Sequence, residues 1–365
     1  MSKVAVHPTK FWHRLNDGRV QCDVCPRQCV LREGQRGLCF VRGCEGGTIV
    51  LYTYGRSSGF CIDPIEKKPL NQFLPGTPVL SFGTAGCNLT CGFCQNWDIS
   101  KSREMDTLAA QATPEGIARA AALHGCRSVA YTYNDPVVFL EYACDTADAC
   151  RALGLRNVAV TAGYISPGAR ERLFSSMDAA NIDLKAFTDD FYKRQCSASL
   201  VPVLETLDYL KAETRVWFEL TTLLIPGYND SEAEIARMAD WVVEHLGPDV
   251  PMHFTAFHPN YKMREVPPTP PPTLSRARRI AMDHGVHYAY TGNVHDNAGG
   301  STLCHACGHL LIERDWHRLG RWGLTSEGCC EICGTRCAGV FEPRPGTWGA
   351  RRMPLASSAM TTSVT

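Results

Sequence analysis

The stretch Cys87-Asn88-Leu89-Thr90-Cys91-Gly92-Phe93-Cys94 places three cysteines in the spacing C-x3-C-x2-C. It follows the apolar run Val79-Leu80-Ser81-Phe82, which predicts a buried strand, and a turn that contains glycine. Four cysteines close the coordination of an iron-sulfur cluster, whereas three leave one iron open to another ligand, as catalytic zinc sites keep one position free. The motif therefore predicts a cluster that takes part in chemistry as well as storing electrons.

This motif resembles the cluster loop of the radical S-adenosylmethionine (SAM) superfamily, and the aromatic Phe93 beside the third cysteine fits it too. The resemblance implies that Cys87, Cys91 and Cys94 are catalytic metal ligands. They would hold a [4Fe-4S] cluster whose open iron chelates the amino and carboxylate groups of SAM. A structural zinc knuckle would instead read C-x2-C twice, so the first gap of three residues argues against one.

Composition narrows the class of protein. The chain has 365 residues, of which 44% are hydrophobic, and this predicts a globular protein of two or three domains. Its 37 basic and 37 acidic residues balance, so neither a nucleic acid nor a membrane surface is the expected partner. No stretch approaches the roughly 20 apolar residues that span a bilayer, and no secretory signal follows Met1. The 19 cysteines stand in metal-ligand spacings, so we expect thiolates in a reducing, cytoplasmic location.

Apolar runs alternate with amphipathic segments through the middle of the chain, which is typical of parallel βα units. The fold class expected is therefore α/β, a partial (β/α) TIM-like barrel of the radical SAM type. In such barrels functional groups lie at the carboxyl ends of the strands, where the cysteine loop also stands. The predicted strands are Val79 to Phe82, Ser128 to Tyr131, Val158 to Thr161, Ile182 to Leu184, Val216 to Thr221, Met252 to Thr255 and His287 to Tyr290.

The cysteines divide the chain into regions. Residues 1–75 are expected to form an N-terminal cysteine-rich metal-binding module, and residues 76–298 the barrel. Residues 299–345 are expected to form a C-terminal zinc-ribbon-like module, and the small and polar residues in 346–365 a disordered tail.

Polar signatures after later strands resemble the relatives of pyruvate formate-lyase activating enzyme. Asn134 and Asp135 occupy the place of that branch's Gly-Gly-Glu motif, although both glycines are absent here. Thr161 and Gly163 end the next strand, and a turn that only starts a helix is the alternative there. The resemblance implies that these residues contact SAM.

Two further segments extend the same resemblance. Asp183 and Lys185 resemble the branch's Asp-x-Lys motif and share one face of a strand, with an ordinary salt bridge as the alternative. Ile225 and Pro226, in Leu224-Ile225-Pro226-Gly227-Tyr228-Asn229-Asp230, resemble the segment that lies against the adenine of SAM. With Asp63-Pro64-Ile65-Glu66-Lys67-Lys68-Pro69-Leu70, the order of motifs is similar to the AmmeMemoRadiSam-system radical SAM proteins.

The C-terminal cysteines Cys304, Cys307, Cys330 and Cys333 form two C-x2-C-G knuckles. Four thiolates make a closed tetrahedral site, so structural zinc is expected. Cys329, Cys330 and Cys333 also resemble a short thiolate element of radical SAM enzymes that act on trivalent arsenic.

The N-terminal cysteines Cys22, Cys25, Cys29 and Cys39 stand in one short glycine-rich segment, and four soft ligands there need a metal to order them. Zinc and an auxiliary iron-sulfur cluster both remain open. The other buried-type cysteines, such as Cys196, are expected to act as small hydrophobes.

The resemblance implies an enzyme that cleaves SAM reductively to a 5'-deoxyadenosyl radical, which abstracts hydrogen from a protein or small-molecule substrate. An electron donor such as flavodoxin or ferredoxin would supply the electron. One alternative is transfer of the 3-amino-3-carboxypropyl group of SAM to arsenic bound by the C-terminal thiolates. A non-enzymatic alternative is an iron-sulfur or zinc scaffold that serves electron transfer.

Overall fold

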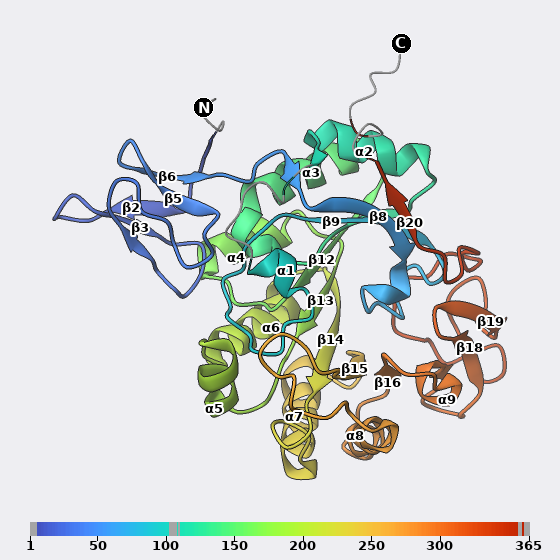
Figure 1. Ribbon diagram of the computed structural model, residues 1–365. Coiled ribbons are helices and arrows are strands. Elements are labelled where there is room, and N and C mark those ends of the chain that lie inside the picture. The colour runs from blue at the N-terminus through green and yellow to red at the C-terminus, as the bar shows by residue number, and fades with distance from the viewer. Residues whose placement is uncertain (1–5, 102–107, 109, 357–359, 361–365) are drawn as a thin grey trace.

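A nine-stranded sheet forms the centre of the molecule in the computed structural model, which describes residues 6–101, 108, 110–356 and 360 (Figure 1). Seven of its strands are consecutive and parallel, and each matches a strand predicted from the sequence, with bounds that differ by up to three residues. They are β9 (Pro78–Gly83), β11 (Ser128–Tyr131), β12 (Arg156–Thr161), β13 (Ala179–Asp183), β14 (Trp217–Leu224), β15 (Met252–Ala256) and β16 (Ala289–Gly292).

Helices connect the parallel strands. The longer ones are α2 (Pro114–Leu123), α3 (Leu140–Ala152), α4 (Pro167–Phe174), α6 (Val201–Glu213), α7 (Glu232–Leu246) and α8 (Pro271–Asp283), and the short ones are α1 (Trp97–Ser100), α5 (Asp189–Phe191) and α9 (Asn297–Gly300). Helix α2 begins as predicted, because the Thr113 side chain accepts a hydrogen bond from the Gly116 N–H and Pro114 occupies the first turn. The described helices include none that is long and apolar enough to cross a bilayer.

Two antiparallel strands extend the sheet beyond β9, and neither was predicted. Strand β8 (Gly59–Pro64) pairs with β9, and β20 (Met353–Leu355) pairs with β8. Strand β8 thus precedes the expected boundary at residue 75, and β20 lies within the expected tail; the domain boundaries stay a prediction. Both segments are short and contain proline, and backbone pairing with the edge of the sheet orders them as strands. Residues 357–359 and 361–365 of that expected tail lie outside the described residues.

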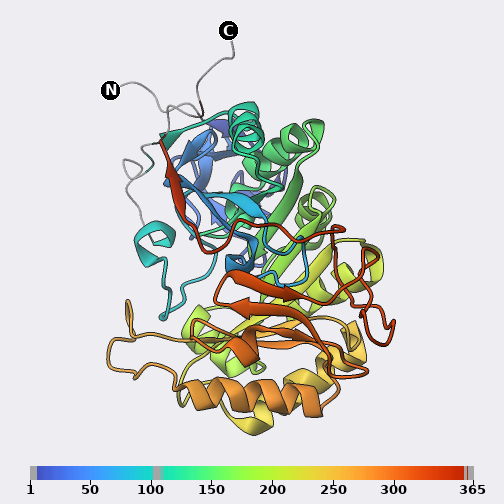
Figure 2. The same cartoon turned by 90° about the vertical axis from the view of Figure 1, so that its right-hand side faces the viewer.

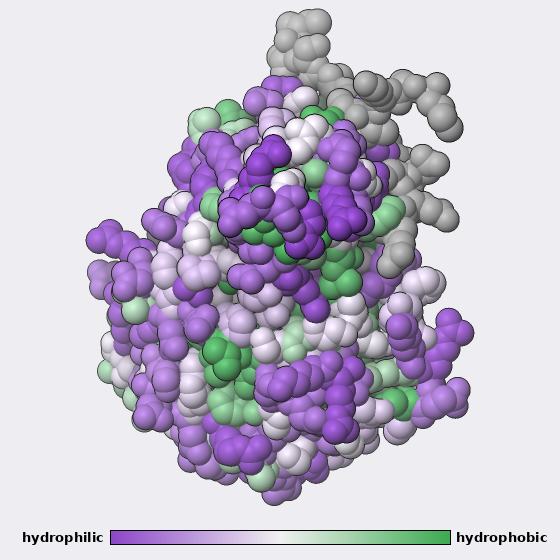
Figure 3. All heavy atoms as spheres, turned by 90° about the vertical axis from the view of Figure 1, so that its left-hand side faces the viewer, coloured by the Kyte–Doolittle hydropathy of each residue, from purple (hydrophilic) through white to green (hydrophobic). Residues whose placement is uncertain are grey.

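The N-terminal region folds as small antiparallel sheets beside α3 and α4 (Figure 1). The sheets are β1 (His7–Pro8), β6 (Thr48–Leu51) and β5 (Arg42–Glu45); β2 (Trp12–Arg14), β3 (Val20–Cys22) and β4 (Val30–Leu31); and β7 (Arg56–Ser57) with β10 (Ala110–Gln111). Its buried Val20, Leu31 and Val41 belong to the same hydrophobic cluster as the main sheet. The face of the molecule that carries this region is mostly hydrophilic, with small hydrophobic patches (Figure 3).

The C-terminal region is a three-stranded antiparallel sheet that lies across the far end of the main sheet (Figure 2). Its strands are β17 (Thr302–Leu303), β18 (Leu310–Asp315) and β19 (Arg318–Trp322). Leu311 and Ile312 of β18 form a separate hydrophobic cluster with Tyr288 and Tyr290 at β16. This cluster fixes the cysteine-rich end of the chain against the last parallel strand.

Candidate functional site

The three-cysteine loop leaves the carboxyl end of β9 and lines a cavity of ≈ 400 Å³ together with residues that follow the neighbouring parallel strands. Cys87, Cys91 and Cys94 all belong to its lining. The loop backbone is held from outside, because the Thr90 N–H donates to the Cys196 carbonyl oxygen at 3.0 Å and the Lys101 Nζ donates to the Leu89 carbonyl oxygen at 2.6 Å. The loop backbone is thus fixed where the three cysteines line the cavity.

Asn134 fixes the start of this loop. Its side-chain Nδ2 donates to the carbonyl oxygens of Ala85 and Gly86 and to the hydroxyl of Thr84, and its Oδ1 accepts from the Thr84 N–H. The side chain is 6% exposed and lines the cavity. Asn134 therefore holds the backbone that leads to Cys87, and a direct contact with SAM stays a prediction.

Asp135 joins the ends of two neighbouring strands. Its carboxylate accepts hydrogen bonds from the Thr161 hydroxyl at 2.8 Å, the Ala162 N–H at 2.9 Å and the Val137 N–H at 3.1 Å. Burial raises the pKa of this carboxyl group, although the three donors oppose the shift. Asp135 and Thr161 both line the cavity, and their contact with SAM stays a prediction.

Asp183 and Lys185 line the same cavity. The Lys185 Nζ lies 2.8 Å from the Asp183 Oδ2 and 5.9 Å from the centre of the Phe93 ring. Burial lowers the pKa of Lys185, but the Asp183 carboxylate and the nearby thiolates outweigh it, so that the pKa lies above its usual value. The predicted pair is thus present and faces the cysteine loop.

Comparison with known proteins places this geometry in a family. The family model of the radical SAM superfamily matches residues 82–239. An uncharacterized protein of Methanocaldococcus jannaschii, MJ0808, is 41% identical over 327 residues, which cover 89% of this chain and 97% of that protein. Residues 82–239 form a domain of the radical SAM superfamily.

Two solved structures are similar in fold. A radical SAM methyltransferase from Sphaerobacter thermophilus is 14% identical, with a TM-score of 0.48, and the match covers 78% of this chain and 76% of that one. A domain of a pyruvate-formate lyase-activating enzyme from Bacteroides vulgatus is 17% identical, with a TM-score of 0.41, and the match covers 46% of this chain and 99% of that one.

The donor set at the loop fits the [4Fe-4S] cluster and SAM that a radical SAM domain implies. Cys87, Cys91 and Cys94 are free thiols on one cavity wall. In the part of the chain that the structure describes, the sulfurs of Cys87, Cys91 and Cys94 do not all lie within 4.8 Å of one another, as the ligands of a single ion would. In the same wall the Thr221 hydroxyl oxygen is buried and, among described atoms, has no hydrogen-bond partner. Polar donors thus remain for a bound radical SAM cofactor.

Three of the predicted cofactor-binding residues lie outside the cavity lining. Gly163 has a φ of +65° and accepts a hydrogen bond through its carbonyl oxygen from Thr206, which fits the turn that was its alternative. Ile225 directly follows the last residue of β14 and is fully buried, and Pro226 comes next in the chain. Their contacts with SAM stay predictions.

Asp63, Lys67 and Lys68 had no predicted role, although the stretch that contains them was singled out in the sequence. Asp63 is fully buried, and its carboxylate lies 2.7 Å from the Lys68 Nζ and 3.2 Å from the Lys67 Nζ. Burial raises the pKa of Asp63, but the two ammonium groups outweigh it and lower the pKa to about 2. Tyr133, at a φ of +71°, also donates to Asp63. Both lysines reach the cavity of the radical SAM site.

Cys196 is buried, as expected of a small hydrophobe, but it also contacts the cysteine loop. Its thiol interacts with that of Cys91, and this hydrogen bond lowers the pKa of Cys196. It stands at the end of a π-helical turn, Tyr192–Cys196, far from the motif in sequence. Nothing in the spacing of the motif could have indicated this fourth thiol.

A second cavity of ≈ 430 Å³ adjoins the first, and Lys67, Pro69, Thr255 and Asn293 line both. It lies between the ends of β15 and β16 and the C-terminal region. Its lining also contains the charged or titratable side chains Glu66, His253, Asp296, Arg314, His317 and Arg352. The radical SAM site therefore opens toward a polar space of similar size.

The C-terminal Cys304, Cys307, Cys330 and Cys333 have sulfurs that all lie within 4.8 Å of one another. The Cys304 and Cys333 sulfurs are 3.6 Å apart, and those of Cys307 and Cys330 are 3.7 Å apart. Cys329 is not a member of this group. Four thiols at this spacing suit one metal ion.

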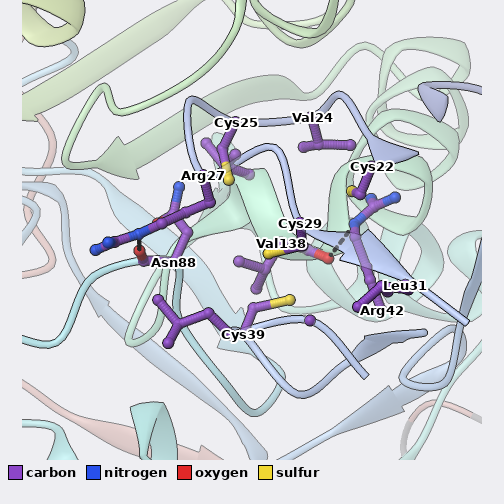
Figure 4. Close-up of a pocket in the computed structure, with 13 residues that line it drawn as sticks. Cys22, Val24, Cys25, Arg27, Cys29, Leu31, Cys39, Arg42, Asn88 and Val138 are labelled. Atoms are coloured by element: carbon purple, nitrogen blue, oxygen red, sulfur yellow. Dashed lines mark hydrogen bonds between the residues drawn. The ribbon is translucent and has the colours of Figure 1, made fainter. Parts of the chain in front are cut away.

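The N-terminal Cys22, Cys25, Cys29 and Cys39 surround a separate cavity (Figure 4). Arg42 and Asn88 also line it. Asn88 directly follows Cys87, so this second group of thiols lies beside the radical SAM loop.

Proposed function

We propose that the chain is a radical SAM enzyme that cleaves SAM at the Cys87, Cys91 and Cys94 cluster and abstracts hydrogen from a protein or small molecule. The observation that carries the proposal is the shared cavity, where three free thiols face the Asp183 and Lys185 pair. When bound, the cluster would supply an electron and SAM would supply a carbon-sulfur bond, and reductive cleavage of that bond gives a 5'-deoxyadenosyl radical.

The side chains divide into ligands and positioning residues in this proposal. Cys87, Cys91 and Cys94 bind iron, and Asn134 orients the loop through its hydrogen bonds to Ala85 and Gly86. Asp135 fixes Thr161 at the end of the next strand. Lys185, Asp183 and the Thr221 hydroxyl supply charge and hydrogen bonds for the polar part of SAM.

The finer assignment is to the activating-enzyme-like branch and, within it, to the AmmeMemoRadiSam-system proteins. The ordered motifs of the sequence support it, as does the position of Lys67 and Lys68 at the cavity. The parallel strands would form a partial barrel, with the cysteine-rich regions as separate metal-binding modules. The C-terminal module would be a zinc ribbon.

The second cavity is the proposed substrate site. It adjoins the SAM cavity through Lys67, Pro69, Thr255 and Asn293, so a substrate there would lie next to the radical. Arg314 and Arg352 in its wall are guanidinium groups suited to a carboxylate or another anionic group. Substrate closure against these walls would exclude water from the radical.

Product analysis tests the reaction. The protein is reconstituted anaerobically with iron, sulfide, SAM and dithionite, with and without arsenite, and the nucleosides are separated. Release of 5'-deoxyadenosine is expected, and Cys91→Ala should abolish it. Cys126→Ala, which removes a buried thiol at the opposite end of the sheet, serves as the control and should retain it.

Other outcomes assign the alternatives. Methylthioadenosine that forms only with arsenite would mean aminocarboxypropyl transfer to arsenic bound by Cys329, Cys330 and Cys333. Against this, none of these three lines either cavity, and Cys330 and Cys333 belong to the four-thiol group. No nucleoside product from a protein that holds its cluster would mean a scaffold or an electron-transfer protein. Replacing dithionite by reduced flavodoxin or ferredoxin would test the donor.

A further inference from the structure

The N-terminal cysteines point toward one another across a common space. Figure 4 shows Cys25, Cys29 and Cys39 around this space, with Cys22 beside Arg42. By the same measure as the two larger cavities its volume is ≈ 20 Å³, and its remaining lining is largely apolar, with Val24, Leu31, Leu38, Val137 and Val138. All four thiols are free.

The spacing of these sulfurs differs from that of a zinc site. In a tetrahedral zinc site with Zn–S bonds of about 2.3 Å, every sulfur lies about 3.8 Å from the others. The C-terminal sulfurs approach this value, at 3.6 and 3.7 Å. Among the described residues, the four N-terminal sulfurs do not all lie within 4.8 Å of one another, and neither do those of Cys87, Cys91 and Cys94. Neither of these two sets therefore converges on one point as the C-terminal set does.

A cubane cluster requires such a spacing, because each thiolate binds a different iron and the inorganic core separates them. We propose that Cys22, Cys25, Cys29 and Cys39 hold a second [4Fe-4S] cluster, closed by four cysteines, and not a zinc ion. With no open iron, this cluster would store and pass electrons and would not bind SAM.

The polar surroundings suit a buried, negatively charged cluster. Arg42 is 2% exposed and lies beside Cys22, where its Nε donates to the Val138 carbonyl oxygen at 2.9 Å (Figure 4). Its guanidinium also pairs with the Glu141 carboxylate. A fixed positive charge at this position offsets part of the charge of the thiolates.

The two cysteine loops are in direct contact. A Cβ atom on Gly86 would lie 2.1 Å from the Cys39 carbonyl oxygen, so the backbones that carry Cys39 and Cys87 pack against each other. The Arg27 Nε donates to the Asn88 carbonyl oxygen at 2.9 Å, and its Nη2 donates to the Cys196 carbonyl oxygen at 3.3 Å. A one-electron donor protein would reduce the N-terminal cluster, which would then pass that one electron to the SAM-site cluster.

Iron retention in a variant without the SAM-site ligands tests the assignment. The full chain with Cys87→Ala, Cys91→Ala and Cys94→Ala is reconstituted anaerobically, and iron, sulfide and zinc are measured with Mössbauer and EPR spectra. About four irons per chain should remain, in a reducible cluster whose EPR signal SAM does not change. Iron below one per chain would overturn the proposal, whether or not zinc rises in its place.

Single variants of the otherwise unchanged chain give the complementary result. Cys39→Ser should lose about four irons and no zinc. Cys44→Ser is the matched control, because Cys44 is 3% exposed in the same region but does not line the cavity, and it should lose neither metal. Equal iron in Cys39→Ser and wild type would also overturn the proposal. If Cys39→Ser does not fold, the triple variant still decides.

This inference rests on the proposed function only for the role of the second cluster. EPR measures how fast reduced flavodoxin reduces the SAM-site cluster. This reduction should be slowed or lost in Cys39→Ser and unchanged in Cys44→Ser. Equal reduction in both would overturn the relay. A wild type that holds both clusters but releases no SAM-derived product would contradict the proposed function alone.

Discussion

The two four-cysteine groups at opposite ends of the chain offer the same ligands in different geometries. The C-terminal thiols stand on two short turns, each followed by a glycine at positive φ, Gly308 and Gly334, and their sulfurs converge within 4.8 Å. The N-terminal thiols surround a cavity whose wall includes Val137 and Val138 from the main domain. The difference shows that the packing behind the ligands, more than their number or type, sets how closely their sulfurs converge.

Removal of the C-terminal metal should have the largest effect. Cys330→Ser is expected to lose one zinc and to unfold the three-stranded sheet, because structural zinc contributes about 10–16 kcal/mol to such modules. Zinc content and hydrogen exchange in β18 measure this. Cys329→Ser is the control, since Cys329 lies outside the four-thiol group. Equal zinc loss in both variants would contradict the assignment of the ligands.

The second largest effect is expected from breaking the buried ion pair of Arg42 and Glu141, which should destabilise the N-terminal region. Arg42→Met leaves the Glu141 carboxylate, which is 10% exposed, without its partner. Breaking a buried pair costs about 3–5 kcal/mol in the free energy of unfolding. Arg151→Met breaks a pair with Asp148 whose side chains are 52% and 54% exposed, and it should cost about 0–1 kcal/mol. Denaturant unfolding compares the two, and equal costs would show that Arg42 does not anchor the region.

The contact between the two cysteine loops can be probed at Gly86. Gly86→Ala introduces a Cβ that meets the Cys39 carbonyl oxygen at 2.1 Å, at a φ of +77°. Gly154→Ala has a similar φ of +72° with nothing within 4 Å, so it carries the backbone strain alone, about 1–2 kcal/mol. Gly86→Ala should cost about 1–3 kcal/mol more, as overpacking does. The same cost in both would mean that the loops separate easily.

The smallest effect concerns Glu66, between the main sheet and the C-terminal region. Burial raises the pKa of Glu66 to about 7, although Arg314 opposes this, and one of its oxygens has no partner among described atoms. The folded protein therefore holds this proton more tightly than the unfolded chain, and stability should fall as pH rises from about 4.5 to about 7. The slope is at most about 1.4 kcal/mol per pH unit.

Glu66→Gln should remove that slope, and unfolding free energies measured across the pH window test it. Glu244→Gln, an exposed carboxylate replacement on α7, is the control and should keep the slope. A slope that persists in Glu66→Gln would assign it to another group.

Prediction from sequence succeeded where the signal is local. The seven parallel strands were found from apolar runs, and Thr113 and Pro114 marked the start of α2. It failed at β8 and β20, because β8 forms by pairing with the edge of β9 and β20 forms by pairing with the edge of β8. The cavity lining includes Asp135 and Lys185, which the sequence singled out, whereas the contact of Cys196 with the cysteine loop and that of Lys68 with Asp63 were not predicted.

The sequence by itself determined the three-cysteine motif, the order of βα units and the presence of three groups of thiols, because each depends on residues close together in the chain. Only the tertiary structure decided which thiols converge on one point and which surround a space. The same holds for the contact of Cys39 with Gly86 and for the lysines at the cavity. Distances between side chains far apart in sequence are set by the packing of the elements that carry them, and metal selection depends on those distances.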